Sequence, residues 1–116
     1  MPVIEDLNVF KMAYQLVLKI YKITAGFPKE EVYGLVSQMR RSAVSVVSNL
    51  SEGGARITDG EQRQFIGNAR GSLVELRTQI WLSRDIGFIN QDDAKEILDN
   101  VEEIKMMMIG LLKCKR

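Results

Sequence analysis

Apolar residues recur every three or four positions along most of the chain, which is the spacing of one face of an α-helix. In the first segment this spacing joins Ala13, Leu16 and Ile20, and in the third it joins Leu73 and Leu76. No segment carries the two-residue alternation that is typical of a half-buried strand. The pattern therefore predicts four helices, over residues 8–24, 29–52, 59–86 and 91–112.

Turn and capping residues separate these segments. Pro28 suits the first position of the second helix, because its ring fixes a helical φ and its missing N–H is not needed there. Thr58 and Glu61 have the spacing of a capping box, in which two side chains satisfy exposed backbone amides at a helix start. The other expected stops and starts are Gly53, Gly54, Gly87 and Asn90.

Helix lengths and short connections together predict the architecture. At 1.5 Å per residue the third helix would be roughly 40 Å long, and the second and fourth roughly 33 Å. Helices of similar length joined by short loops pack as an antiparallel bundle. We therefore expect an all-α, up-down-up-down four-helix bundle that forms one domain over residues 1–116, with a short basic tail at 113–116.

Residues that carry chemistry are scarce in this chain. It has no histidine and a single cysteine, Cys114, so it lacks the usual members of catalytic pairs, metal sites and disulfides. Its longest apolar run, residues 106–112, is far shorter than the ~20 residues that span a bilayer. Glu5 and Asp6 stand where a signal peptide would carry positive charge. We expect a cytoplasmic protein with no enzymatic activity, cofactor, metal, membrane association or small-molecule substrate.

A polar stripe lies beside the apolar stripe of the second helix. Its members, at three- and four-residue steps, are Gln38, Arg41, Ser45, Asn49 and Glu52. Such a stripe is a device for recognition or assembly. A catalytic carboxylate pair of Glu52 with Glu75 would lack a nucleophile, and a buried Glu52 paired with an arginine is the simpler expectation.

An extra apolar row steps by sevens along the third helix, outside its core stripe. Val74, Trp81 and Phe88 form this row. They either widen the core face, with Phe88 covering the helix end, or form a subunit interface centred on Trp81. The sequence supports the two interpretations about equally.

Arginine makes a second repeat at sevens on the same helix. The arginine row consists of Arg63, Arg70, Arg77 and Arg84, with Arg56 in the loop before it. Four guanidinium groups over roughly 30 Å could follow a phosphate backbone. The competing interpretation is ion pairing within the bundle or between subunits, and the candidate acidic partners are Glu75, Glu96, Asp99 and Glu103. A net charge of only +1 makes pairing the somewhat stronger expectation.

Two stretches of the chain resemble a known bacterial family. They read Phe27-Pro28-x-x-Glu31-x-Tyr33-Gly34-Leu35-x-Ser37-Gln38-x-Arg40-Arg41-Ser42-Ala43-x-Ser45 and Ser48-Asn49-Leu50-x-Glu52-Gly53-x-x-Arg56. These motifs, and further similarity from about Ile4 to Leu112, are similar to the four helix bundle proteins that are also labelled 23S rRNA intervening-sequence proteins. Val47 departs from the family where many relatives carry proline, which predicts a straighter second helix. Gln62 departs where an aromatic residue is usual, which puts a packing contact in doubt.

The resemblance implies a homo-oligomeric ring, by family likeness a homopentamer. A related branch, the accessory protein of diversity-generating retroelements, is a more basic pentameric barrel that binds nucleic acid and a reverse transcriptase. The family's motif residues, whose role is structural or functional, correspond here to Gln38, Arg41, Asn49, Glu52, Arg70 and Ser72.

These observations favour a non-enzymatic oligomeric bundle that associates with RNA or a ribonucleoprotein through its arginines. The alternative is a structural or protein-interaction ring without nucleic-acid binding, in which intersubunit ion pairs consume those arginines. Joint substitution of Arg63 and Arg77 separates the two, because it removes RNA retention in the first and dissociates the ring in the second.

Overall fold

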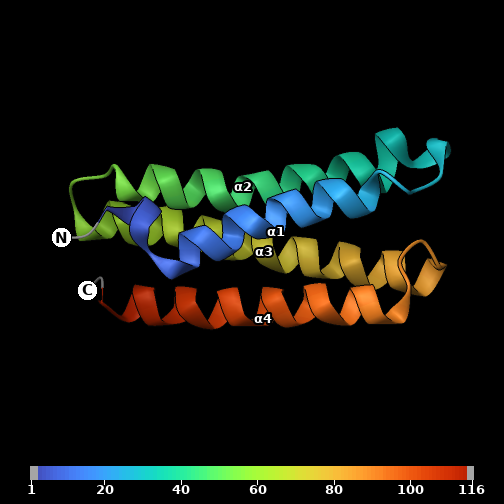
Figure 1. Ribbon diagram of the computed structural model, residues 1–116. Helices are drawn as coiled ribbons and strands as arrows, with labels where there is room; N and C mark the ends of the chain where they lie inside the picture. The colour runs from blue at the N-terminus through green and yellow to red at the C-terminus, as the bar shows by residue number, and fades with distance from the viewer. Residues whose placement is uncertain (1–2, 115–116) are drawn as a thin grey trace.

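Four long helices run alternately up and down the molecule in the computed structural model, which describes residues 3–114 (Figure 1). The described chain measures 43 × 25 × 20 Å. This confirms the predicted all-α, antiparallel four-helix bundle. The long helices are α1 (Asn8–Thr24), α2 (Ser37–Gly54), α3 (Asp59–Ile86) and α4 (Gln91–Cys114), and the short helical turns are η1 (Ile4–Asp6), η2 (Lys29–Glu31) and η3 (Val32–Val36).

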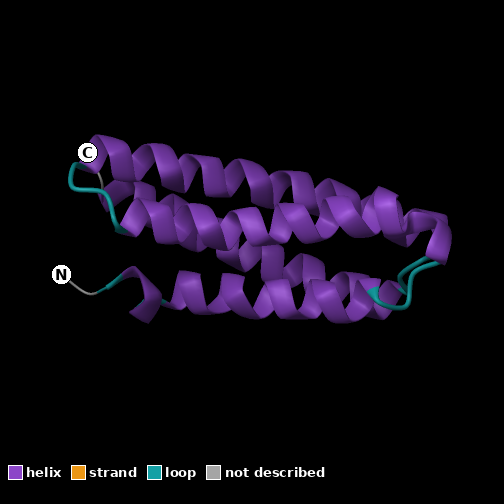
Figure 2. Cartoon of the chain, turned by 90° about the horizontal axis from the view of Figure 1, so that it is seen from above, coloured by secondary structure: helices purple, strands orange, loops and turns teal. Residues whose placement is uncertain are grey.

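Each long helix packs against two neighbours. Helix α1 contacts α2 and α4, and α3 also contacts α2 and α4, so α1 and α3 are the diagonal pair. Short loops at the two ends of the bundle join consecutive helices (Figure 2). Side chains on opposite faces of α3 therefore meet different helices, α2 on one side and α4 on the other.

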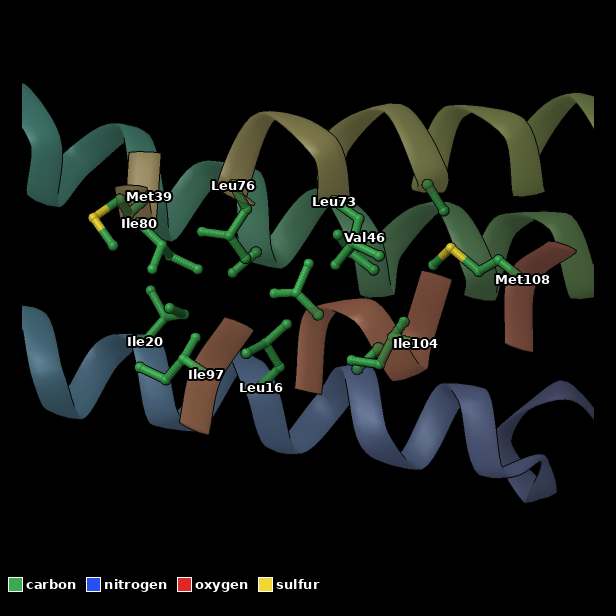
Figure 3. Packing of buried hydrophobic residues seen from close by; sticks show 14 of the residues in the cluster. Leu16, Ile20, Met39, Val46, Leu73, Leu76, Ile80, Ile97, Ile104 and Met108 are labelled. Atoms are coloured by element: carbon green, nitrogen blue, oxygen red, sulfur yellow. The ribbon is translucent and has the colours of Figure 1, made fainter. Parts of the chain in front are cut away.

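The core lies along the bundle axis, where the apolar stripes of all four helices meet (Figure 3). Ile20, Met39, Leu73 and Ile104, one from each helix, have no measurable exposure. These are residues of the three-four spacing, so the sequence pattern identifies the buried faces correctly. Their burial fixes which way the remaining polar residues of each helix face.

The second helix starts later than predicted, because its expected first turns are not regular α-helix. Pro28 has an extended ψ of 145° and precedes a 3₁₀ turn rather than opening the helix. A π turn follows, with Gly34 in a non-helical conformation (φ −108°, ψ −117°). The carboxylate of Glu31 accepts a hydrogen bond from the Leu35 amide at 3.3 Å, and a Cβ on Gly34 would lie only 3.1 Å from that carboxylate. Regular α-helix begins at Ser37.

The other helix ends agree better with the capping residues. Thr58 accepts a hydrogen bond from the Glu61 amide at 3.2 Å, as in a capping box, and its hydroxyl contacts the Glu61 carboxylate at 3.1 Å. Gly87 ends α3 with φ 100°, a conformation that favours glycine. Asn90 accepts from the Asp93 amide at 2.8 Å, and α4 continues to Cys114, two residues beyond the predicted end.

The paired glycines do not stop α2, contrary to expectation. The helix runs without interruption through Val47 and includes both Gly53 and Gly54. Gly54 instead allows the N-terminal turn to approach, since a Cβ there would lie 2.3 Å from the Ile4 side chain. A residue without a side chain is needed for this close contact.

Candidate nucleic-acid interface

Polar side chains of α2, including Ser45 of the polar stripe, form contacts with α3. Ser42 donates to the Glu75 carboxylate at 2.9 Å, and the hydroxyls of Ser45 and Ser72 lie 2.8 Å apart. Asn49 donates to the Ser45 carbonyl at 2.9 Å and thereby supports the same seam. Ser72 and Asn49, two of the family motif residues, therefore join or brace helices in this chain.

The remaining motif residues of α2 are exposed. Gln38 and Arg41 both lie at the surface. Glu52 is exposed as well and forms an ion pair with Arg56 one turn further on. The expectation that Glu52 pairs with an arginine is confirmed, but the expectation that it is buried is wrong, because this part of α2 leads into the solvent-exposed loop.

Arg56 anchors the loop between α2 and α3. Besides its ion pair with Glu52, its guanidinium stacks over the Phe65 ring at 4.8 Å. Gln62 donates from its side chain to the Arg56 carbonyl at 2.8 Å. Gln62 thus makes a hydrogen bond at a position where an aromatic residue is usual in the family. Arg56 has a structural function here.

The two ends of the arginine row are held within the molecule. Arg63 donates to the Leu112 carbonyl of α4 at 2.7 Å. Arg84 pairs with Asp85 at 2.9 Å. The hydrogen bond from Arg84 lowers the pKa of the Asp85 carboxyl below its ordinary value of 3.8, and the charge of Arg84 acts in the same direction. Neither end of the row is fully available to a ligand.

The middle of the row is different. Arg70 is exposed, and within residues 3–114 it forms no ion pair. Arg77 is half-buried and its guanidinium stacks over the Trp81 ring at 4.8 Å, while Trp81 itself stays 39% exposed. These three residues place two cations and an aromatic surface together on α3.

The acidic partners expected for the row lie elsewhere, so this expectation is wrong within one copy of the chain. Glu96 pairs with Lys19 of α1 at 3.4 Å, and Asp99 pairs with Lys95 of α4 at 2.9 Å. Glu75 accepts from α2, as described above. At 100° per residue, Glu103 shares the helix face of Glu96 and Asp99. Of these three residues, only Glu96 forms an ion pair with another helix within residues 3–114, namely with Lys19 of α1. The rotation of α4 thus leaves Arg70 and Arg77 without these acids.

The apolar row of α3 contains two residues rather than three. Val74 and Trp81 are 37% and 39% exposed on the helix. Phe88 lies beyond the end of α3, where it is half-buried and its ring packs against Phe27 at 5.4 Å. Phe88 therefore covers the helix end, and a subunit interface at Val74 and Trp81 stays a prediction.

A cationic surface on α1 was missed at the sequence level. Tyr14, Leu18 and Tyr21 are 51%, 51% and 43% exposed, with Lys11 and Lys22 exposed beside them. Asn8–Thr24 contains no Asp or Glu. Two features of the sequence could have indicated this surface: the segment lacks acidic residues, and its two tyrosines are seven residues apart. The three-four spacing of apolar residues identifies only the buried side of the helix.

Other kinds of site find little support in residues 3–114. Among these residues, no helix is long and apolar enough to cross a membrane, and no group of three acidic or cysteine residues is placed to hold a metal ion. A cavity of about 830 Å³ opens at the end of the bundle, lined by residues that include Ile4, Ile57, Leu111 and Cys114. No residue of the arginine row lines this cavity.

Comparison with known proteins places the chain in a family. No curated protein matches it. A solved structure with a TM-score of 0.82 is that of a protein of unknown function from the S23 ribosomal protein family of Bacteroides thetaiotaomicron. It is 18% identical and covers 90% of this chain and 98% of its own, so it supports the fold. The model of the 23S rRNA-intervening sequence protein family matches residues 5–110, and the chain therefore belongs to the 23S rRNA-intervening sequence protein family.

Proposed function

We propose that this protein is a non-enzymatic, homo-oligomeric bundle of the cytoplasm that associates with RNA or a ribonucleoprotein. The observation that carries the proposal is the pair of arginines in the middle of α3. Arg70 and Arg77 have no acidic partner among the described residues, and Arg77 lies on the exposed ring of Trp81. In this proposal the two guanidinium groups bind phosphates and the indole ring stacks on an unpaired base.

The spacing of these groups suits a nucleic-acid strand. Arg70 and Arg77 are two helical turns apart, or about 10 Å along the helix axis. Each guanidinium can donate two parallel hydrogen bonds to a phosphate, and bases stack readily on aromatic side chains. The contact of Arg77 with Trp81 also holds that arginine in place before a ligand arrives, which lowers the entropic cost of binding.

Oligomerisation supplies the rest of the affinity in this proposal. Two arginines per copy make few phosphate contacts, in keeping with the net charge of +1. A ring, by family likeness a homopentamer, would present the same group several times, and linked weak contacts gain affinity through effective concentration. The family description refers to 23S rRNA, and the Bacteroides relative is assigned to a ribosomal protein family. Both names favour RNA over DNA as the partner.

The proposal is tested by measuring RNA affinity at several salt concentrations. Fluorescence anisotropy with a labelled structured RNA compares the native protein with the double variant Arg70→Gln/Arg77→Gln. We expect an affinity loss of at least about tenfold, because two charge-assisted contacts disappear. The slope of log affinity against log salt should fall by about one for each arginine removed.

A control removes one positive charge from another surface. Lys29→Gln changes an exposed residue of the α1–α2 turn, outside the polar stripe of α2, and it should leave the salt slope almost unchanged. Light scattering should give equal oligomer masses for all three proteins. Equal RNA affinity of the native protein and the α3 variant would refute the proposed contact.

A second candidate function is a ring that binds only proteins. Two observations favour it: Val74 and Trp81 expose apolar surface on α3, and Arg56, Arg63 and Arg84 already have partners inside the protomer. This candidate predicts that neither the native protein nor Arg70→Gln/Arg77→Gln retains the RNA, and that the variant changes oligomer mass. The same two measurements therefore distinguish both candidates.

A further inference from the structure

One helix of the bundle exposes apolar groups and hydrogen-bond donors but no carboxylate. We call this surface of α1 the donor face and define it by Lys11, Tyr14, Leu18, Tyr21 and Lys22 (α1 in Figure 1). Its three hydrophobic side chains, Tyr14, Leu18 and Tyr21, are each at least 43% exposed. Lys11 and Lys22 form no ion pair within the described residues. Exposed aromatic residues in a row are typical of a surface that a partner covers.

The neighbouring helix exposes the opposite chemistry. We call this surface of α4 the acid stripe and define it by Asp92, Glu96, Asp99 and Glu103. The four lie within about 60° of each other around the helix, at 100° per residue. Glu96 and Asp99 make exposed ion pairs, whereas Asp92 and Glu103 make none within residues 3–114. Much of its negative charge is therefore not neutralised inside the protomer.

The two surfaces match in length as well as in chemistry. From Lys11 to Lys22, and equally from Asp92 to Glu103, the helix advances eleven residues, or roughly 17 Å. Ammonium groups donate hydrogen bonds and phenols can do so, while ionised carboxylates only accept them. We propose that the donor face of one copy binds the acid stripe of a second copy. This inference rests on the proposed function only in requiring an oligomer.

Neither surface is suited to bind itself. Two donor faces would bring lysines together, and two acid stripes would bring carboxylates together, so like charges disfavour a symmetric contact. The contact is therefore heterologous, with different surfaces on its two sides. Heterologous contacts build closed rings or open filaments, depending on the rotation between successive copies.

The placement of the two surfaces favours a ring. Helices α1 and α4 are neighbours in the bundle, joined at the surface by the Lys19–Glu96 ion pair. Outward faces of neighbouring helices in a four-helix bundle point roughly a quarter turn apart. Each added copy is consequently rotated relative to the previous one, so the assembly curves, as a ring requires, rather than extending in a straight line. Arg70, on α3, stays outside this contact and remains open to RNA.

Apolar burial adds to the charge complementarity. Leu18 lies between the lysines of the donor face, and Met106, 58% exposed, follows the acid stripe on α4. Docking would remove these side chains from water, which favours association. The donor face thus carries apolar surface between its lysines, and Met106 adds apolar surface at one end of the acid stripe.

Charge reversal on either side tests the contact in the full-length protein. Lys11→Glu/Lys22→Glu and Asp92→Lys/Glu103→Lys each place like charges opposite each other, so light scattering should give masses close to the 13.2 kDa of one chain. The quadruple variant carries both reversals and restores complementarity with the charges exchanged. We expect it to recover the oligomer mass of the native protein.

A control and a second variant pair keep the test decisive. Lys29→Glu reverses an exposed charge outside both surfaces and outside the polar stripe of α2, and it should leave the oligomer intact. Should a reversal reduce the helix content measured by circular dichroism, the milder Lys11→Gln/Lys22→Gln replaces it, with a smaller expected loss of mass.

The outcomes also separate this inference from the proposed function. An oligomeric native protein whose mass survives both reversals would overturn the donor face–acid stripe contact and leave the oligomer proposal standing. A monomeric native protein would refute both. Loss of oligomer in each double variant, without recovery in the quadruple variant, would also overturn the specific pairing.

Discussion

The two edges of helix α3 carry polar residues with different surroundings. On the edge toward α2, Ser72 and Glu75 meet hydroxyl groups of α2 at 2.8 and 2.9 Å. On the other edge, Arg70 forms no ion pair with a described residue, and Arg77 finds only the face of Trp81. Both edges follow regular helical spacing in the sequence, so spacing alone does not distinguish them.

The two edges differ because the adjacent helices, α2 and α4, carry different side chains. Helix α2 presents hydroxyl groups toward α3, whereas Glu96 of α4 pairs with Lys19 of α1. Polar groups that form hydrogen bonds within the chain stabilise the bundle, because a buried polar group without a hydrogen-bond partner would lower the free energy of unfolding. Cations without such partners contribute little to folding and are available to a ligand.

The largest expected effect comes from the core that separates the two edges. Leu73 is fully buried between them. Leu73→Ala should reduce the free energy of unfolding by roughly 3 to 5 kcal/mol, since it removes apolar contacts and leaves a cavity. Chemical denaturation followed by circular dichroism measures this loss. A reduction below about 1 kcal/mol would show that the bundle repacks freely and that the core does not fix the orientation of α3.

The next largest effect is expected at the hydrogen bond between Ser42 of α2 and Glu75 of α3. Ser42→Ala should cost about 1 kcal/mol of unfolding free energy, because the buried hydroxyl no longer donates to Glu75. In a double-mutant cycle with Glu75→Gln, the two changes should be non-additive by about 0.5 to 1 kcal/mol. Arg70→Gln, by contrast, should alter stability by less than about 0.5 kcal/mol. Additive effects at positions 42 and 75, or a large cost at position 70, would erase the distinction.

Much of the fold follows directly from local sequence. The limits of α3 are predicted correctly because a capping box and a glycine with positive φ, both short-range devices, mark its ends. The start of α2 is predicted wrongly because Glu31 caps a backbone amide and Gly34 accepts a non-helical conformation. A helical pattern of apolar residues does not reveal that interruption.

The candidate site was less predictable, since it depends on how helices are rotated against one another. Spacing correctly put the arginines on one edge of α3, but it did not reveal that Arg63 binds the Leu112 carbonyl. It also did not reveal which helix Glu96 faces. The donor face of α1 was missed for a related reason, because Tyr14 and Tyr21 gain significance only once the opposite side of the helix is known to be buried.

The smallest expected effect concerns the Arg84–Asp85 pair, at the end of the arginine row where a partner does exist. Arg84 lowers the pKa of Asp85 below 3.8, so the pair stabilises the folded state above that pH. Its contribution is lost as the pH falls through the lowered pKa of the folded protein. In Arg84→Gln the pKa of Asp85 should rise toward 3.8, as measured by NMR titration of its carboxyl carbon. Because Asp85 is exposed to solvent and Arg84 is only half-buried, thermal stability at neutral pH should hardly change. An unchanged Asp85 titration would show that the pair does not persist in solution, and Arg84 would then join Arg70 as a cation open to phosphate.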